Sequence, residues 1–382
     1  MQTPDGTLDV HRQTIRPAGG ASARRPAPER YALNRPEPTT TSIPTQWVGP
    51  LRVSGTAFTD GAGYEEVEVP LATFETPLWP SVGRGASISR EVPDGIRTTV
   101  VSECMTRSVL FTAEDGAVAA EASRTITARL EDLQDTVSTT TTHGRLVDLH
   151  PEIVGNLLYV RFELHPGDAS GHNMVTKAAD ALMERILSWD LGLSYGSVSG
   201  NFCSDKKATA VNGILGRGKN VVADLFLPHE VVERRLRTTA SAVAEIVVQK
   251  NLVGSTIAGA LRSANAHYAN MLLGIYLATG QDAANIVEGS QGITYAEARE
   301  DGLYFSCTLP NIIVGTVGSG KHHDDVTEAL ERMGCRENRK VGENSRRLAS
   351  LVAATVLCGE LSLLAAQTNP GELMSTHLSM ER

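Results

Sequence analysis

The sequence predicts a mixed fold of helices and strands, in which a small α+β domain is inserted into a larger domain. Strand-like and helical stretches alternate from about residue 46 onward, as in α/β and α+β proteins. Between residues 109 and 198 the alternation ends in an amphipathic helix, which indicates a separate small domain. A length of 382 residues is sufficient for two domains. We therefore expect the larger domain in two parts, 46–108 and 199–370.

The composition is that of a soluble globular enzyme, with 41% hydrophobic and 21% charged residues. A net charge of -9 gives no basic face for nucleic acid. The most apolar stretch, 351–366, is interrupted by Glu360 and is shorter than a membrane span. The amino terminus has no apolar core of a signal peptide, so we expect a cytoplasmic protein.

Five cysteines are scattered along the chain, in an odd number and without a C-x-x-C pair. This pattern indicates free thiols in a reducing compartment and no zinc site, so no metal is predicted. The cysteines are Cys104, Cys203, Cys307, Cys335 and Cys358.

Residues 1–45 are predicted to be a disordered extension, because they hold seven of the seventeen prolines, six arginines and few large apolar groups. A transit peptide is the less favoured alternative, since acidic residues such as Asp5 and Glu29 are spread through the segment.

The first part of the larger domain contains strand-like stretches at 66–71 and 96–101 and a glycine-flanked turn at 83–87. Glu75 is a lone carboxylate among apolar and small residues. It is either a surface glutamate or a desolvated acid suited to giving a proton near neutral pH. Arg107 is either a clamp for a carboxylate or a surface ion-pair partner.

In the small domain we expect a helix at 117–134, strands at 145–149 and 157–162, and a helix at 174–187. The segment 167–173 joins the second strand to the second helix through two glycines. A strand, a glycine-containing turn and the start of a helix together can form a binding site for a phosphate group. The segment lacks the G-x-G-x-x-G pattern, so a Rossmann fold is not predicted.

The polar loop 199–207 ends in Asp205-Lys206-Lys207. A carboxylate beside an ammonium can hold it in place and keep it charged. A fixed ammonium is what a reaction needs when negative charge grows on a carbonyl oxygen. A solvated charged turn is the simpler interpretation of these nine residues alone.

The second part of the larger domain is predicted to contain a strand at 221–227, a helix starting at 230 and a long central helix at 252–280. Strands at 303–306 and 311–314 and a helix at 345–367 follow. Residues 315–321 match the G-x-x-x-x-G-K frame of a phosphate-binding loop, but His322 stands where a magnesium-holding hydroxyl is required. This weakens a triphosphatase interpretation. The tail 371–382 carries His377 and could fold over a site or fray.

Five motifs in order resemble the family of 3-hydroxy-3-methylglutaryl-coenzyme A (HMG-CoA) reductases, from about Trp47 onward. They are Ser-Gly-Asn at 199–201 with Asp-Lys-Lys at 205–207, Lys-Asn-Leu-Val-Gly-Ser at 250–255, Asn-Ala-His-x-Ala-Asn at 265–270, Gly-Gln-Asp-Ala-Ala at 280–284, and Gly-Thr-Val-Gly-x-Gly at 315–320. The resemblance implies a large domain around a central helix with a ferredoxin-like insertion. It also implies reduction of a thioester to an alcohol by two hydride transfers from a nicotinamide, in the mevalonate pathway of isoprenoid biosynthesis.

By this resemblance, four residues carry the chemistry. Lys206 looks like the lysine that steadies the oxyanion, and Asp282 like the carboxylate that orients it. Glu75 looks like the acid that protonates the mevaldehyde oxygen. His377 looks like the tail histidine that protonates the departing thiolate, which suits an imidazole near neutral pH.

The resemblance also assigns binding residues. Those for the hydroxymethylglutaryl group are Arg107, Ser199, Asn201, Asp205, Lys207, Lys250 and Asn270. Those for the cofactor are Asp168, Ala169, Ser170, Gly171, His172 and Asn173, with Arg145 as a possible partner of a 2′-phosphate. In this loop Ser170 and His172 replace two methionines of the family pattern. NADPH is favoured slightly over NADH.

The family places its site between two subunits, so a homodimer or larger assembly is implied, with HMG-CoA and CoA as the small-molecule partners and no membrane anchor. The family's Glu-Asn-x-x-Gly motif is replaced by Thr45-Gln46-Trp47-Val48-Gly49, so the resemblance does not carry over the subunit contact that this motif makes. Two alternatives stay open: the same chemistry run oxidatively from mevalonate with NAD, and an acyl-CoA-binding homologue without turnover.

Overall fold

The computed structural model describes residues 39–58, 63–372 and 374, and residues 43–382 form one compact unit. Most of the predicted extension at 1–45, and His377 in the predicted tail, lie outside the described residues. The proposed boundaries at 46–108, 109–198 and 199–370 fall inside the single compact unit, so they stay a prediction.

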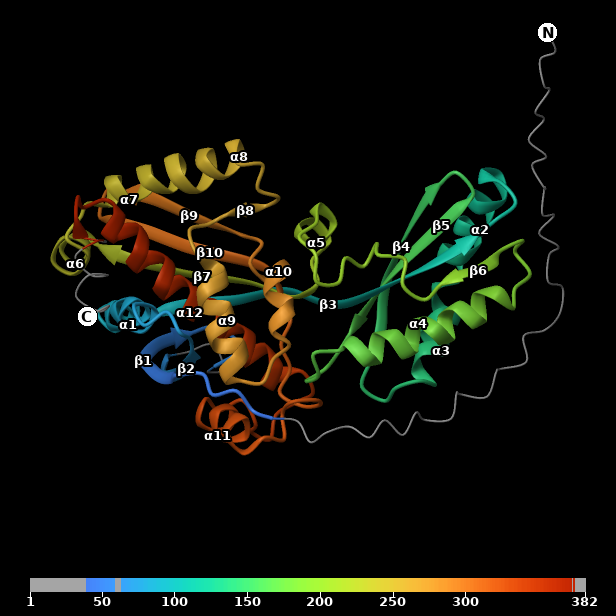
Figure 1. Cartoon of the computed structure of the whole chain (residues 1–382), viewed down its shortest axis with the longest axis horizontal. Helices are drawn as coiled ribbons and strands as arrows, with labels where there is room; N and C mark the ends of the chain where they lie inside the picture. Colours follow the sequence, from blue (N-terminus) through green and yellow to red (C-terminus); the bar gives the residue numbers. More distant parts are fainter. Residues whose placement is uncertain (1–38, 59–62, 373, 375–382) are drawn as a thin grey trace, which may run out of the picture. The chain divides into compact units, whose positions relative to one another are not determined.

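A large mixed sheet forms the body of this unit (Figure 1), with the strand order β2-β1-β3-β7-β10-β9-β8. Most neighbouring strands in it are antiparallel, whereas β1–β3 and β8–β9 are parallel. Its strands are β1 Thr45–Ser54, β2 Glu65–Ala72, β3 Ile96–Thr112, β7 Gly218–Pro228, β8 Ser263–Ala264, β9 Gly292–Arg299 and β10 Gly302–Ile312.

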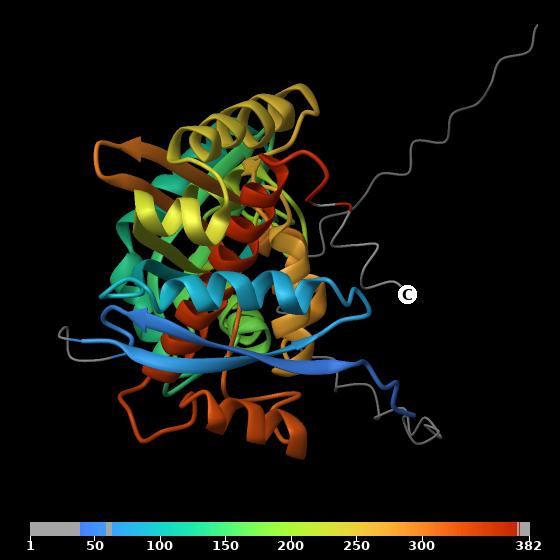
Figure 2. The same ribbon diagram turned by 90° about the vertical axis from the view of Figure 1, so that its left-hand side faces the viewer.

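The helix α12 (Glu343–Gln367) is the centre of the larger core. It is long and apolar enough to cross a membrane, but 94% of the relevant window is buried inside the protein, as expected of a core helix. The helix α1 (Leu78–Ser89) packs on α12 so closely that a Cβ on Gly85 would lie 2.4 Å from the Cα of Cys358. Figure 2 shows α1 lying alongside the β1–β2 hairpin.

A second, smaller sheet is built from β4 (Arg145–Val154), β5 (Leu157–His165), β6 (Ser194–Ser197) and the second half of β3. The helices α2 (Gly116–Ala128), α3 (Leu130–Ser138) and α4 (His172–Leu187) belong to this part of the chain and contribute side chains to its separate core. The element order βαββαβ and the strand order β4-β5-β3-β6 are those of a ferredoxin-like fold. The predicted insertion is therefore present.

The strand β3 belongs to both sheets (Figure 1). Residues 97–104 pair with β7 in the large sheet, and residues 105–112 pair with β5 in the small one. One continuous strand thus joins the two halves of the fold, and the loop with Lys206 lies between β6 and β7, where the chain returns to the large sheet.

The predicted central helix at 252–280 is wrong. The chain there forms a π-helical segment η2 (Val247–Gly254), a short α8 (Ser255–Ile257), the two-residue β8 and then α9 (Tyr268–Ala278). Left-handed backbone at Gly259 and Arg262 stops the helix. The alanine-rich composition predicted a continuous helix, but α12 occupies the centre instead.

Smaller differences concern three other elements. Residues 83–87 were predicted to form a turn but lie inside α1. The glycine at position 85 serves the close contact with α12 and does not mark a turn. The helix predicted at 117–134 divides into α2 and α3 at Arg129, whose backbone leaves the helical region. The two strands predicted at 303–314 are one bulged strand, β10.

The remaining elements are short. They are α5 Ala210–Leu215, α6 His229–Val231, η1 Val232–Leu236, α7 Ala240–Ile246, η3 Ala283–Asn285, α10 Ile286–Gly289 and α11 Asp324–Arg332. All five cysteines are free and buried, as the sequence predicts for reduced thiols.

Candidate active site

The predicted lysine and aspartate meet in an ion pair. The Nζ of Lys206 lies 2.8 Å from Oδ2 of Asp282, and both side chains are 41% exposed. Asp282 caps the start of η3, where its carboxylate accepts a hydrogen bond from the amide of Ala284. The hydrogen bond that Lys206 donates to Asp282 raises the pKa of Lys206. Partial burial opposes ionisation of Asp282, but the hydrogen bonds from Lys206 and from the amide of Ala284, together with the charge of Lys206, lower the pKa of Asp282.

The polar loop 199–207, called the lysine loop from here on, holds three non-glycine residues with left-handed backbone, namely Asn201, Ser204 and Lys206. Each such residue costs about 1 kcal/mol or more, so the loop must be held by its surroundings. The amide of Gly200 donates to the carbonyl of Ser108, and the amide of Lys206 donates to the carboxylate of Glu288. Backbone strain of this kind concentrates at functional sites.

A cavity of about 280 Å³ lies beside this pair. Its lining comes from the lysine loop, from β3, from the residue just before β7, from the start of α4 and from the cap of η3. The lining residues are Arg107, His172, Asn173, Val175, Thr176, Asp205, Lys206, Arg217 and Asp282. The structure thus brings predicted substrate and cofactor residues to one cavity.

Asp205 lies among three basic side chains of this cavity. Its carboxylate lies 3.0 Å from Arg217, 3.8 Å from Arg107 and 3.9 Å from His172. Burial, together with the nearby positive charge of Arg217, lowers the pKa of His172 to about 4. His172 is therefore neutral near pH 7, and the arginines supply the positive charge that a carboxylate ligand requires.

The predicted cofactor segment 168–173 lies against the glycine-rich segment 315–320. Ala169 forms a parallel bridge with Val317, and the amide of Thr316 donates to the carbonyl of Asp168. A Cβ on Gly315 would lie 2.3 Å from the backbone nitrogen of Ser170, so only glycine permits this approach. The carboxylate of Asp168 does not face the cavity, because it accepts hydrogen bonds from the amides of Gly342 and Ser345 at the start of α12.

Lys321 does not act as the lysine of a triphosphate-binding loop. Its ammonium donates to the carbonyl of Gly280, just before Asp282. Burial lowers the pKa of Lys321 to about 8. The lysine instead ties the glycine-rich segment to the segment that carries Asp282.

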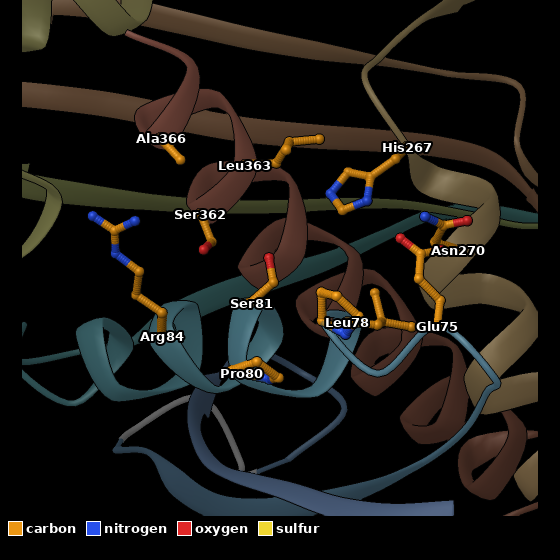
Figure 3. A pocket seen from close by; sticks show the side chains of 11 residues that line it. Glu75, Leu78, Pro80, Ser81, Arg84, His267, Asn270, Ser362, Leu363 and Ala366 are labelled. Carbon is orange, nitrogen blue, oxygen red and sulfur yellow. The ribbon is translucent and has the colours of Figure 1, made fainter. Parts of the chain in front are cut away.

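A second pocket, of about 230 Å³, is lined by Glu75, His267 and Asn270 together with apolar residues of α1 and α12. Figure 3 shows Glu75 and Asn270 close together, with His267 on the same side of the pocket. Glu75 is exposed, so the predicted desolvation of this acid is not present in the single chain. Asn270, which the resemblance assigns to binding of the hydroxymethylglutaryl group, lies in this pocket and does not line the Lys206 cavity.

A buried glutamate of α12 organises the segment that enters this pocket. Glu360 accepts hydrogen bonds from the amides of Ala266 and His267 and from the side chains of Asn251 and Thr294. Lys250, a predicted substrate residue, lies half-buried on η2, and burial lowers its pKa while Glu360 opposes this. The sequence identified Glu360 only as an interruption of an apolar stretch.

The other predicted residues have simpler surroundings. Ser199 and Asn201 are exposed in the lysine loop, and Lys207 donates to the carbonyl of Asp205. Arg145 is exposed at the start of β4. Within the described residues, no cluster of three His, Cys, Asp or Glu could hold a metal ion.

Two residues of the site were missed. Arg217 is 1% exposed and contacts both Asp205 and Glu288, and Glu288 is fully buried. The only signal in the sequence was a charged residue in each of two otherwise apolar or small-residue stretches, 213–218 and 283–289.

Comparison with known proteins identifies the family. Residues 38–382 match the model of the hydroxymethylglutaryl-coenzyme A reductase family. A 3-hydroxy-3-methylglutaryl-coenzyme A reductase of Pyrococcus horikoshii is 45% identical over 327 residues, which cover 85% of this chain and 78% of that protein. The corresponding protein of Methanocaldococcus jannaschii is 41% identical over 345 residues, covering 89% and 82%.

Among solved structures, the class II 3-hydroxy-3-methylglutaryl-CoA reductase from Streptococcus pneumoniae bound to NADPH has a similar fold, with a TM-score of 0.66. The two chains are 20% identical, and the match covers 86% of each. Fold and site together define an enzyme with a carboxylate-held lysine beside an inserted ferredoxin-like domain. The chain belongs to the hydroxymethylglutaryl-coenzyme A reductase family.

Proposed function

We propose that this chain reduces HMG-CoA to mevalonate and free CoA. The reaction consumes two reduced nicotinamides and two protons, and it converts a thioester into a primary alcohol and a thiol. The observation that carries the proposal is the Lys206–Asp282 pair in a cavity shared with the cofactor segment. The named relatives support the substrate, and the mevalonate pathway of isoprenoid biosynthesis is the context that they imply.

In this proposal Lys206 binds the carbonyl oxygen of the thioester and stabilises the negative charge that grows there. Asp282 keeps the ammonium charged and aimed, as their 2.8 Å contact supports. Arg107 and Asp205 form the polar wall that faces the hydroxymethylglutaryl group. A preorganised cation requires little rearrangement as the charge develops, which is the physical source of the rate enhancement.

Two proton donors complete the chemistry. Glu75 would protonate the oxygen of the aldehyde intermediate, and closure of a partner subunit over its exposed pocket would supply the desolvation that the single chain lacks. His377 would protonate the departing thiolate of coenzyme A, and it lies outside the described residues.

The residues around 168–173 and 315–320 suit a nicotinamide cofactor, whose bound form supplies hydride. Gly318 and Gly320 have left-handed backbone, and a Cβ on Gly318 would meet open space, so this segment can present its amides to a ligand. The segment 168–173 also leads directly into the start of α4, where free backbone amides favour binding of an anion. We propose NADPH as the preferred cofactor, with NADH as the alternative, and the NADPH-bound solved relative supports this order.

We further propose a homodimer or larger assembly in which the site is completed across subunits. Within one chain, Glu75 and Asn270 line one pocket and Lys206 and Asp282 another, and the two share no lining residue. An exposed apolar stripe on η2 and α8 flanks Lys250 and needs a cover. Its members are Val248, Leu252, Val253 and Ile257, which is 83% exposed.

Subunit complementation tests this arrangement. Glu75→Gln and Lys206→Ala are each expected to abolish activity, whereas mixed and re-equilibrated subunits should recover about a quarter of it if sites are shared, assuming random pairing. No recovery in proven mixed dimers would place each site within one chain.

The primary test follows oxidation of NADPH and of NADH with HMG-CoA, for the wild type and for Lys206→Ala. Turnover that the substitution abolishes supports the reductase function, and the faster cofactor settles the preference. A folded wild type that is inert with both cofactors, yet binds HMG-CoA, would instead indicate a binding protein. Faster formation of HMG-CoA from mevalonate, CoA and NAD would favour the oxidative direction. A cytoplasmic location stays our proposal.

A further inference from the structure

The carboxylate of Glu288 is a fully buried acceptor beneath the lysine loop. Its Oε1 accepts hydrogen bonds from the amide of Lys206 at 3.0 Å, from Nη1 of Arg217 at 2.8 Å and from Nδ2 of Asn285 at 3.0 Å. Glu288 lies on α10, directly after η3. It contacts the lysine loop through the backbone amide of Lys206, and it does not line either pocket.

Lys206 needs such a support. Its φ of 56° lies in the left-handed region, which a lysine adopts only when its surroundings impose it. Its side chain is 41% exposed, so packing does not fix the direction of the ammonium. The direction therefore depends on the backbone at Lys206 and on the contact with Asp282.

Both ends of Lys206 are held by one short segment. Asp282 caps η3 and binds the ammonium, and Glu288 on the following α10 binds the amide of the same residue. Two attachment points on one segment define the position of the lysine relative to Asp282. A displacement of either point would turn the ammonium away from its carboxylate.

Arg217 makes the burial of Glu288 possible. Its guanidinium is 1% exposed and lies 2.8 Å from Glu288 and 3.0 Å from Asp205. A buried carboxylate without such a partner would be strongly disfavoured. Arg217 thus connects Glu288, which holds the amide of Lys206, to the carboxylate of Asp205. The neighbouring residues Asp205 and Lys206 are therefore positioned by the same buried ion pair.

We propose that Glu288 is a positioning residue for Lys206, which acts by holding the backbone amide of the lysine at a fixed reach. This inference rests on the function proposed above, because it concerns the lysine that would stabilise the oxyanion.

Two substitutions separate reach from charge. Glu288→Asp keeps the negative charge that Arg217 needs but withdraws the carboxylate by one methylene, whereas Glu288→Gln keeps the length and an acceptor oxygen but loses the charge. If reach is decisive, Glu288→Asp should lower kcat by about 10²-fold, as a displacement of about 1 Å can do, with the KM for NADPH unchanged. Glu288→Gln should stay within about tenfold of wild type because its oxygen still accepts from Lys206.

Glu297→Gln is the matched control, because Glu297 on β9 is also an ion-paired glutamate, and its side chain is 43% exposed. Thermal unfolding establishes that each variant is folded. Equal activity of Glu288→Asp and wild type, or a larger loss in Glu288→Gln than in Glu288→Asp, would overturn the proposal.

A second measurement does not depend on turnover. Competitive labelling with an amine reagent, read by mass spectrometry, reports how far Lys206 is held as an ammonium by Asp282. Labelling of Lys206 should rise roughly tenfold in Glu288→Asp, because the fraction of free amine follows the pKa, while Lys207 serves as the internal standard. Asp282→Asn should raise it equally, and adding Glu288→Asp to Asp282→Asn should change nothing further.

An additive effect of the two substitutions on labelling would contradict the positioning role. If wild type shows no turnover with HMG-CoA while this labelling pattern holds, the proposed function fails and the role of Glu288 stands.

Discussion

The ammonium of Lys206 lies 2.8 Å from the carboxylate of Asp282, although one residue precedes α5 and the other follows α9. The contact joins the loop that leaves the small sheet to the segment beneath the glycine-rich residues 315–320. Lys321, at the end of that stretch, donates to Gly280, two residues before Asp282. The charge that would stabilise the oxyanion is thus fixed by both parts of the fold.

Asp282→Asn removes the charge that orients Lys206 and keeps its shape. We expect kcat to fall by about 10²-fold, since a misaligned cation loses much of its stabilisation of the transition state. Steady-state kinetics with HMG-CoA and NADPH measures this. Asp301→Asn, in the exposed turn before β10, is the control and should retain wild-type kcat. If Asp282→Asn has the kcat of the wild type, Asp282 has no part in the mechanism.

His172 should make the protein less stable in mild acid. Burial, with the charge of Arg217, lowers its pKa to about 4, so between about pH 4 and 6.5 the unfolded chain binds a proton that the folded chain does not. Stability therefore falls as the pH decreases through this window. From pH 7 to pH 5 the loss attributable to this group is about 2 kcal/mol.

Urea unfolding at the two pH values tests this expectation. His172→Gln, which does not titrate, should show a pH dependence smaller by that amount. An identical pH dependence in the variant and the wild type would show that His172 is not held neutral by its site.

Two glycines of α1 should respond oppositely to alanine. A Cβ on Gly85 would lie 2.4 Å from the Cα of Cys358, so Gly85→Ala should destabilise the fold by about 1–3 kcal/mol or more through overpacking. At Gly83 the nearest atom is 3.7 Å away, and Gly83→Ala should be neutral or stabilising by up to about 1 kcal/mol from helix propensity. Chemical denaturation of both variants measures the contrast, and equal effects would refute the close helix contact.

The exposed stripe on η2 and α8 should control assembly. Ile257→Glu places a charge in the apolar face and is expected to shift sedimentation toward the monomer, with loss of activity if the partner completes the site. Val154→Glu, 59% exposed on the small sheet, should change neither property. An assembly that survives Ile257→Glu intact would move the subunit contact to another face.

The sequence was most informative where chemistry depends on short local patterns. The Asp-Lys-Lys loop and Asp282 were predicted as partners, and the structure joins them, although the roles of these residues stay proposals. Alternating strands and helices predicted a small inserted α+β domain, and the family resemblance implied that this domain is ferredoxin-like. The segment 252–280 was predicted wrongly because alanine-rich composition cannot reveal left-handed residues such as Arg262, which are imposed by tertiary contacts.

Glu288 and Arg217 escaped prediction for a different reason. A single charged residue in an apolar stretch gives no sign of its partner, and the two lie in separate elements. Asp168 was assigned to the cofactor by resemblance, but its carboxylate binds the start of α12, which no local pattern indicates. Only the folded chain shows which polar groups support others.

The helix α12 is bonded near one end to the segment 168–173, through Asp168 and Ser345, and further along to the pocket of Glu75, through Glu360 and His267. An α-helix advances about 1.5 Å per residue, so these two attachments are separated by about 22 Å along a rigid rod. The number of residues between Ser345 and Glu360 therefore sets the distance between two half-sites, namely the Lys206 cavity and the Glu75 pocket. Substitutions along α12 would change its packing, whereas inserting one residue would rotate one attachment by about 100° relative to the other and put the half-sites out of phase.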